Sequence, residues 1–198
     1  LHGKHALVCG SSKGIGKAAA IELAQLGAHV TLAARSAKVL EQVKAELPSS
    51  EGQQHHYLVV DFSDRDDLRK KVQALVAKRS VHILVNNTGG PPGGPITEAT
   101  EADFLKAFSN HLLCNHLLTQ EVTAGMEQDG YGRIINVIST SVKQPLAGLG
   151  VSNTIRGAVA NWAKTMANEL GSRGITVNNV LPGATATDRL AQIIANKA

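Results

Sequence analysis

Aromatic side chains are scarce in this 198-residue chain: they make up 3% of it, while hydrophobic residues make up 43%. The core must therefore be built mainly from Val, Ile, Leu and Ala, which suits a parallel sheet buried between helices. The chain also lacks a basic stripe interleaved with aromatics. Its net charge is +4, and its longest cationic cluster is Arg69-Lys70-Lys71, which is typical of a solvated helix face. This distribution argues against a nucleic-acid partner.

Cysteine is nearly absent as well, since Cys9 and Cys114 are the only two thiols. So few cysteines in a chain of this length favour a reducing compartment, and we expect a cytoplasmic protein. No apolar run reaches the length that spans a membrane, and the first residues, LHGKHALV, lack a signal-peptide pattern. The histidines have no Cys or carboxylate neighbours at metal-ligand spacing, so we expect no metal site and no membrane partner.

Short apolar runs of strand length alternate with longer stretches of helical periodicity. The predicted strands cover residues 5–9, 29–34, 56–61, 82–86, 133–138 and 176–181. The predicted helices cover residues 15–26, 64–78, 104–126 and 158–170, and a further one starts near Asp188 and runs to the end of the sequence. Repeated strand–helix units predict an α/β fold with a doubly wound parallel sheet. No break in composition marks a second domain, so residues 1–198 are expected to form a single domain.

A glycine-rich turn, LVCGSSKGIGKAAA, joins the first predicted strand to the first helix and contains Gly10, Gly14 and Gly16. Glycine lets backbone amides approach a pyrophosphate closely, and the helix N-terminus adds positive potential. The spacing differs from the general Gly-x-Gly-x-x-Gly fingerprint, and a purely structural turn is the alternative interpretation. The position between strand and helix favours a dinucleotide site. The other residues of this turn that would bind the dinucleotide are Ser12, Lys13 and Ile15.

The end of the second strand indicates which dinucleotide is bound. NAD sites often have an acid near this point for the ribose hydroxyl, but this chain has Ala34, then Arg35 and Ser36. A guanidinium suits a phosphate, so we expect NADP(H) in preference to NAD(H), with Lys13 as a second positive charge. The alternative is that Arg35 and Lys13 are ordinary surface cations.

Asp61 and Phe62 follow the third strand at the same expected edge of the sheet. The Asp61 carboxylate is a candidate acceptor for the adenine amino group. It could instead cap the helix that begins near Asp64, and the sequence does not separate these two roles.

Five motifs, in order along nearly the whole chain, resemble the short-chain dehydrogenase/reductase family. They are GSSKGIG (10–16), VVDFSD (59–64), VNNTGG (85–90), GRIINVIS (132–139) and VNNVLPGATATDR (177–189). The resemblance is closest to a divergent group of 3-oxoacyl-[acyl-carrier-protein] reductases with an incomplete active site. It implies a Rossmann-type sheet with a nicotinamide cofactor across the strand ends. It also implies a homodimer or homotetramer that acts on a small-molecule substrate. Family members continue through another helix and a final strand, so we expect both to be missing from this sequence.

The resemblance assigns further cofactor-binding residues. Asn86, Asn87 and Gly89 would support the adenine ribose. The residues that would border the nicotinamide and the pyrophosphate are Pro182, Gly183, Thr185 and Thr187.

The resemblance also exposes a gap in the catalytic set. The family uses a tyrosine as general acid or base, a lysine four residues later, a serine and an asparagine. Ser139 matches the serine, but Val151 and Ile155 stand at the tyrosine and lysine positions, and His111 stands at the asparagine position. Val151 cannot transfer a proton, and general acid catalysis typically contributes about 10²–10⁴-fold to the rate.

No shift of the alignment restores the missing pair. Tyr57 and Tyr131 are the only tyrosines, and neither has a lysine four residues later. Arg156 lies next to the lysine position, but one residue turns a side chain by about 100° on a helix, so we do not expect it to substitute. His111 is a candidate relocated acid because imidazole ordinarily titrates near neutral pH, and Lys143 is a second candidate.

Three functions remain open at this point. The first is an NADP(H)-linked oxidoreductase of this family, acting on a carbonyl or an alcohol with a degenerate catalytic set. The second is an NADP(H)-binding protein without turnover, serving as a sensor or partner subunit. The third is a structural subunit that binds no nucleotide, which the glycine turn and Arg35 disfavour.

Overall fold

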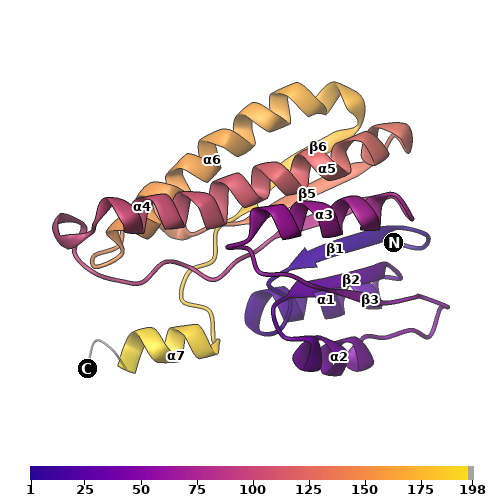
Figure 1. Ribbon diagram of the computed structural model, residues 1–198, viewed down its shortest axis with the longest axis horizontal. Helices are drawn as coiled ribbons and strands as arrows, with labels where there is room; N and C mark the ends of the chain where they lie inside the picture. Colours follow the sequence, from indigo (N-terminus) through magenta and orange to yellow (C-terminus); the bar gives the residue numbers. More distant parts are fainter. Residues whose placement is uncertain (196–198) are drawn as a thin grey trace.

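Six parallel strands form one sheet in the order β3-β2-β1-β4-β5-β6 (Figure 1). The computed structural model describes residues 1–195, and of residues 189, 192 and 193 the backbone alone. The strands are β1 (His5–Cys9), β2 (His29–Ala34), β3 (His56–Val59), β4 (Ile83–Asn86), β5 (Gly132–Val137) and β6 (Ile175–Val180). The strand order reverses between β1 and β4. Ligands of such sheets bind at this switch point, outside the carboxyl ends of the strands.

Helices cover both faces of the sheet (Figure 1). One face carries α1 (Gly14–Gln25) and α2 (Ala37–Glu46), and the other carries α3 (Arg65–Val76), α5 (Cys114–Gln128) and α6 (Gly150–Leu170). The remaining helical segments are η1 (Ile96–Glu98), α4 (Glu101–Phe108), η2 (Ser109–Leu113), η3 (Thr140–Val142), η4 (Gly171–Arg173) and α7 (Asp188–Ala195). No helix within residues 1–195 combines the length and apolar character needed to cross a membrane.

The core has two apolar layers, one on each side of the sheet. Successive residues of a strand point to opposite faces. In β1, Ala6 and Val8 therefore pack in the layer under α1 and α2, while Leu7 and Cys9 pack in the layer under α3, α5 and α6. The largest fully buried side chains are aliphatic or Met, as the shortage of aromatics predicts, with the exception of His111.

The six predicted strands match the observed ones to within two residues at each end, and the doubly wound parallel sheet is confirmed. The helix predicted over residues 104–126 is interrupted. It consists of α4, a π-helical turn at η2, and α5. A π turn inserts one residue into a helix, and the spacing of apolar residues does not predict it.

The helix predicted over residues 158–170 begins eight residues earlier, at Gly150. Its first turns contain Gly150, Ser152 and Asn153, whose intrinsic helix propensity is low. Packing of Val151 and Ile155 against α4 stabilises these turns and overrides propensity. The helix predicted from Asp188 is α7, and residues 196–198 of that prediction lie outside the described residues.

Candidate functional site

The glycine turn after β1 packs directly against the end of β4. Gly10 has φ +59°, and a Cβ atom there would lie 2.5 Å from the Asn87 backbone oxygen. A Cβ atom at Gly16 would lie 2.3 Å from Gly10 O and 2.6 Å from Asn87 Nδ2. Asn87 Nδ2 donates hydrogen bonds to Cys9 O at 3.2 Å and to Gly10 O at 3.3 Å. Gly10 and Gly16 therefore admit no side chain, and the turn is held at the switch point of the sheet.

The turn leads into the N-terminus of α1, which begins at Gly14 after Lys13. The N–H groups in the first turn of a helix have no carbonyl partner within it, and the helix dipole favours an anion there. Ser12 and Ile15 of this turn are partly exposed. Ser11, which sequence reasoning missed, is fully buried, and its Oγ accepts a hydrogen bond from Ala33 N at 2.9 Å. It fixes the turn to β2, and nothing in the sequence distinguishes it from its neighbour Ser12.

The segment after β6 reaches the same turn. A Cβ atom on Gly14 would lie 3.4 Å from Thr187 Cγ2, and Lys13 Nζ lies 3.5 Å from Asp188 Oδ2. Both charged groups are mostly exposed, so this ion pair contributes little to stability. Thr187 Oγ1 donates to Thr185 O, and Thr185 Oγ1 donates to Gly183 O, each at 3.3 Å. Thr187 of the predicted cofactor site therefore lies beside the glycine turn.

Arg35 and Asp61 follow the adjacent strands β2 and β3, and both are exposed. Ser36 is the N-cap of α2 and accepts a hydrogen bond from Val39 N at 3.4 Å. Hydrogen bonds from the Ser63 N–H at 2.9 Å and from the Ser63 hydroxyl at 2.8 Å hold the pKa of Asp61 below its usual value. The positive charge of Arg35 lowers this pKa further.

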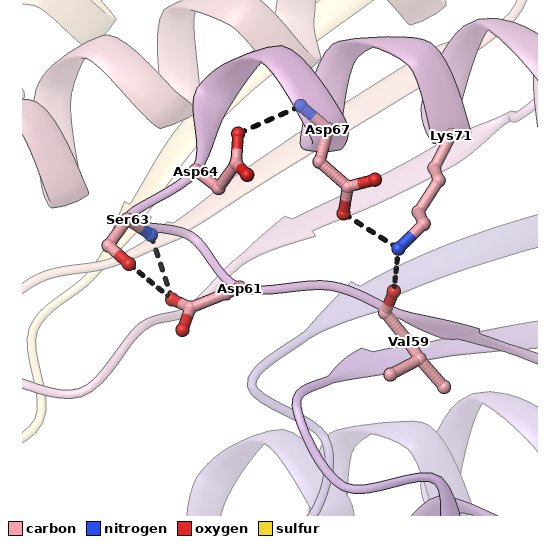
Figure 2. Close-up of polar contacts among 6 residues, drawn as sticks. All are labelled: Val59, Asp61, Ser63, Asp64, Asp67 and Lys71. Atoms are coloured by element: carbon pink, nitrogen blue, oxygen red, sulfur yellow. Dashed lines mark hydrogen bonds and ion pairs between the residues drawn. The ribbon is translucent and has the colours of Figure 1, made fainter.

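Figure 2 shows which carboxylate caps α3, and it therefore tests the helix-cap role that the sequence left open for Asp61. The N-cap of α3 is Asp64, whose Oδ1 accepts a hydrogen bond from Asp67 N at 3.0 Å. Asp61 binds Ser63 instead, so the helix-cap interpretation of Asp61 is wrong. Phe62 packs partly against the core, and its backbone oxygen accepts a hydrogen bond from Cys114 Sγ.

A ladder of three asparagines crosses the sheet at the ends of β4, β5 and β6. Asn86 Nδ2 donates to Asn136 Oδ1 at 2.9 Å, and Asn136 Nδ2 donates to Asn179 Oδ1 at 3.1 Å. Asn86 is 2% exposed, so its side chain is buried. Any contact with a ribose would therefore come from its backbone at the end of β4. A Cβ atom on Gly89 would meet open space. Sequence reasoning missed Asn136 and Asn179, although an asparagine at the same level of three apolar strands is a readable signal.

Ser139 lies two residues beyond β5 and is the N-cap of η3. Its Oγ accepts a hydrogen bond from Ser141 N at 3.1 Å, which leaves the hydroxyl proton available for donation. The next residue, Thr140, donates its N–H to Pro182 O at 3.1 Å, and a Cβ atom on Gly183 would lie 3.9 Å from Thr140 Cγ2. Ser139 therefore adjoins the Pro182–Gly183 segment.

His111 lies in the π-helical turn and is 2% exposed. Its Nδ1 lies 2.6 Å from the hydroxyl oxygen of Thr88, which follows β4 by two residues. Because β4 and β5 are adjacent, His111 contacts one strand end and Ser139 follows the next. The structure thus brings the two predicted catalytic residues to the same edge of the sheet.

Val151 and Ile155 lie in the first two turns of α6 and pack against Ala107 of α4. Both are buried. Val151 also borders a cavity of about 180 Å³ whose other lining residues belong to segment 91–95, Glu98, Ala99 and Asp103. These two positions contribute apolar contacts between α4 and α6 and no group that can move a proton.

The other candidate groups lie elsewhere. Tyr57 in β3 donates to Glu41 Oε2 at 3.1 Å, and Tyr131 precedes β5 at the amino end of the sheet, with Lys4 Nζ 4.4 Å from its ring centroid. Both tyrosines are therefore remote from Ser139, and Lys143 is exposed. Among the residues that the structure describes, no group of three His, Cys, Asp or Glu is arranged to hold a metal ion.

Comparison with known proteins identifies this architecture. The family model for short chain dehydrogenases matches residues 4–198. Gluconate 5-dehydrogenase of Gluconobacter oxydans is 31% identical over 198 residues, which are 100% of this chain and 77% of that protein. The 3-oxoacyl-[acyl-carrier-protein] reductase FabG of Pseudomonas aeruginosa is 32% identical over 98% of this chain and 78% of its own length. The solved structure of YwfH, an NADPH dependent reductase involved in bacilysin biosynthesis, superposes with a TM-score of 0.93 at 27% identity and covers 98% of this chain and 77% of its own. The chain belongs to the short-chain dehydrogenase/reductase family.

Proposed function

We propose that this protein is an NADP(H)-linked oxidoreductase that reduces a carbonyl group of a small-molecule substrate or oxidises the corresponding alcohol. The observation that carries the proposal is the glycine turn at the switch point. Gly10 and Gly16 leave no room for a side chain there, so the backbone is bare where a pyrophosphate would approach.

The residues at the strand ends fit NADP(H) as a set. The turn from Gly10 to Gly16, which includes Ser12, Lys13, Gly14 and Ile15, would hold the pyrophosphate with its amides. Arg35, with Ser36, would hold the 2′-phosphate, since a guanidinium suits a phosphate. Asp61 and Phe62 would border the adenine. The remaining contributors are Asn86, Asn87 and Gly89 at the ribose and Pro182, Gly183, Thr185 and Thr187 at the nicotinamide and pyrophosphate. The description of YwfH as NADPH dependent supports this choice of cofactor.

The catalytic roles follow from the polar groups beside the nicotinamide end of this site. The nicotinamide, when bound, supplies or accepts the hydride. Ser139 accepts a hydrogen bond from Ser141 N, so its own proton can bind the oxygen of a substrate carbonyl. His111 is the candidate acid, and its contact with Thr88 orients the ring. Together they would replace part of what the family's tyrosine and lysine provide.

The names of the relatives support a carbonyl compound, or the corresponding alcohol, as the substrate. Gluconate 5-dehydrogenase and 3-oxoacyl-[acyl-carrier-protein] reductase are both among them, and a 3-oxoacyl group is our first candidate. We further expect a homodimer or homotetramer located in the cytoplasm. Cys9 and Cys114 are both unpaired thiols, which suits a reducing compartment.

One observation favours a second function, which is NADP(H) binding without turnover. Val151 and Ile155 fill the α4–α6 contact with apolar side chains. In that case the protein would serve as a sensor or as a partner subunit.

A fluorescence titration with NADPH and with NADH, followed by a deuterium-transfer assay, tests both functions. Saturable binding that prefers NADPH, with stereospecific transfer of deuterium from labelled NADPH to a carbonyl compound, would establish the oxidoreductase. Binding without transfer across a panel that includes 3-oxoacyl thioesters and keto sugars would establish the second function. Binding of neither nucleotide would overturn both.

A further inference from the structure

Arg156 connects α6 to the end of β5. Its side chain is 8% exposed, and Nη1 donates a hydrogen bond to the Val137 backbone oxygen at 3.0 Å. Val137 is the last residue of β5, two residues before Ser139. The guanidinium therefore contacts the last residue of β5, two residues before the proposed catalytic serine.

The same segment is held from the opposite side by β6 and the loop that follows it. Ile138 N donates to Val180 O at 2.9 Å, and Thr140 N donates to Pro182 O at 3.1 Å. The amides of Ile138 and Thr140 thus donate to carbonyls on the β6 side, and the carbonyl of Val137 accepts from Arg156 of α6. These contacts fix residues 137–140 between the two elements. The Ser139 hydroxyl is then oriented by Ser141 N.

We infer that Arg156 is a positioning residue, which acts through Ser139 by fixing the carboxyl end of β5 against α6. This inference rests on the proposed function, because it gives Arg156 the task of holding Ser139 in place for catalysis. Arg156 belongs to α6, the helix that also contains Val151 and Ile155. Arg156 lies next to the position that the resemblance assigns to the lysine, and its side chain points toward β5, where Nη1 donates to the Val137 backbone oxygen.

The chemistry of the contact favours arginine specifically. A buried carbonyl that loses its donor pays the full desolvation penalty, so truncation of Arg156 destabilises this strand end. Lysine keeps the charge but has a shorter reach and no planar fork of donors. Arg156→Lys should therefore keep the fold and weaken the contact, whereas Arg156→Met removes the donor.

Amide hydrogen exchange of the full chain tests the positioning directly and needs no turnover. The Ser141 amide is bonded to Ser139 Oγ, so its exchange rate reports on the serine hydroxyl. We expect Arg156→Met to speed exchange at Ile138, Thr140 and Ser141 about tenfold or more, and Arg156→Lys to do so by less. The matched control is Lys164→Met, which removes an exposed cation two turns further along α6 and should leave these amides unchanged.

Kinetics with a carbonyl substrate then separates positioning from mere stabilisation. We expect Arg156→Met to lower kcat about tenfold while the Kd for NADPH changes less than about threefold. In a Ser139→Ala background the same substitution should lower kcat no further, because its effect passes through Ser139. Arg156→Lys should recover part of the lost kcat.

The outcomes are distinguishable. An equal loss of kcat from Arg156→Met with and without Ser139 would overturn the inference, and so would unchanged exchange at Ser141 in both Arg156 variants. If the protein shows no turnover, the oxidoreductase proposal fails, and the exchange result alone decides the role of Arg156. If Arg156→Met does not fold, Arg156→Lys carries the same comparison.

Discussion

Thr88 Oγ1 and His111 Nδ1 lie 2.6 Å apart, and this contact joins the loop after β4 to the π-helical turn between α4 and α5. π turns are frequent at functional sites, where the inserted residue redirects a side chain. Here the turn buries an imidazole against Thr88, two residues after β4, and the adjacent strand β5 leads to Ser139. The first prediction concerns this pair.

His111→Ala should lower kcat about 10²-fold or more, because general acid catalysis is typically worth this much. Thr88→Val should lower it by a smaller factor, since it leaves the ring in place but removes the partner of Nδ1. His116→Ala is the matched control, because His116 contacts Trp162 of α6 instead. Steady-state rates with the best carbonyl substrate measure all three. Unchanged rates in both His111→Ala and Ser139→Ala would show that neither residue is catalytic.

The second prediction concerns the choice of nucleotide. Arg35→Ala should weaken NADPH binding about 10–100-fold and leave NADH binding nearly unchanged, because a hydrogen bond to a charged group contributes about 1.5–3 kcal/mol. Lys38→Ala, an exposed cation on the neighbouring helix α2, is the control and should affect neither. Fluorescence titrations at one fixed salt concentration measure the affinities. Equal losses for both nucleotides would contradict the assignment of Arg35 to the 2′-phosphate.

The third prediction concerns the glycine turn. Gly16→Ala places a Cβ atom 2.3 Å from Gly10 O, which requires the turn to move. Overpacking of this kind costs about 1–3 kcal/mol, and the displaced amides should abolish nucleotide binding. Gly157→Ala in α6 meets nothing within 4 Å and should be neutral or stabilising by up to about 1 kcal/mol. Urea unfolding and NADPH titration compare the two, and equal behaviour would refute the packing argument.

The fourth prediction is an acid-sensitive stability. His5 at the start of β1 is 4% exposed, with Nε2 2.8 Å from Thr31 Oγ1 and Nδ1 3.1 Å from Ser80 O. Burial is the main cause that lowers its pKa from 6.5 to about 4. The unfolded chain therefore takes up a proton near pH 6.5, and the folded chain only near pH 4. As the pH is lowered from 6.5 to 4, the free energy of unfolding should decrease by up to about 3 kcal/mol because of this group. Above pH 6.5 the contribution of His5 to stability should be fully present.

Urea unfolding at pH 7.5, 5.5 and 4.5 measures this dependence. His5→Gln should reduce the loss of stability on acidification, while His2→Gln, at a largely exposed position, should not. Part of the dependence should remain in His5→Gln, because burial also lowers the pKa of His56 and His82. An identical pH dependence in His5→Gln and the unchanged chain would contradict the assignment.

The fifth prediction concerns Ile155, which the resemblance assigns to the family's lysine position. Ile155→Lys places an ammonium group in the apolar contact with Ala107 and should destabilise the protein by about 2–4 kcal/mol. Ile155→Leu, which conserves volume, should cost less than about 1.5 kcal/mol. Thermal or urea unfolding compares them. A fully stable Ile155→Lys variant would show that this position opens toward the cofactor site, as it does in the family pattern.

Much of the candidate site was predictable, but the contacts of its residues were not. Through the resemblance, the sequence placed Ser139 directly after a strand and His111 within a helix at the family's asparagine position. It placed Gly10 and Gly16 in the turn between the first strand and the first helix. Whether Asp61 or Asp64 caps α3 could not be read, because both carboxylates precede the helix within one turn. The long-range partner of Arg156 was equally hidden, since helical periodicity identifies a helix but not which backbone group a polar side chain on it reaches.

The sequence by itself determined the parallel sheet, the glycine turn and the family. These depend on local properties, namely the period of apolar residues, the spacing of glycines within one turn and the five short motifs along the chain. Only the tertiary structure decided that α6 begins at Gly150, that a π turn brings His111 to Thr88 from 23 residues away, and that Arg156 reaches Val137 across 19. These features depend on strand order, on helix packing and on the direction of each side chain. All three are set by apolar contacts between residues that are distant in the sequence.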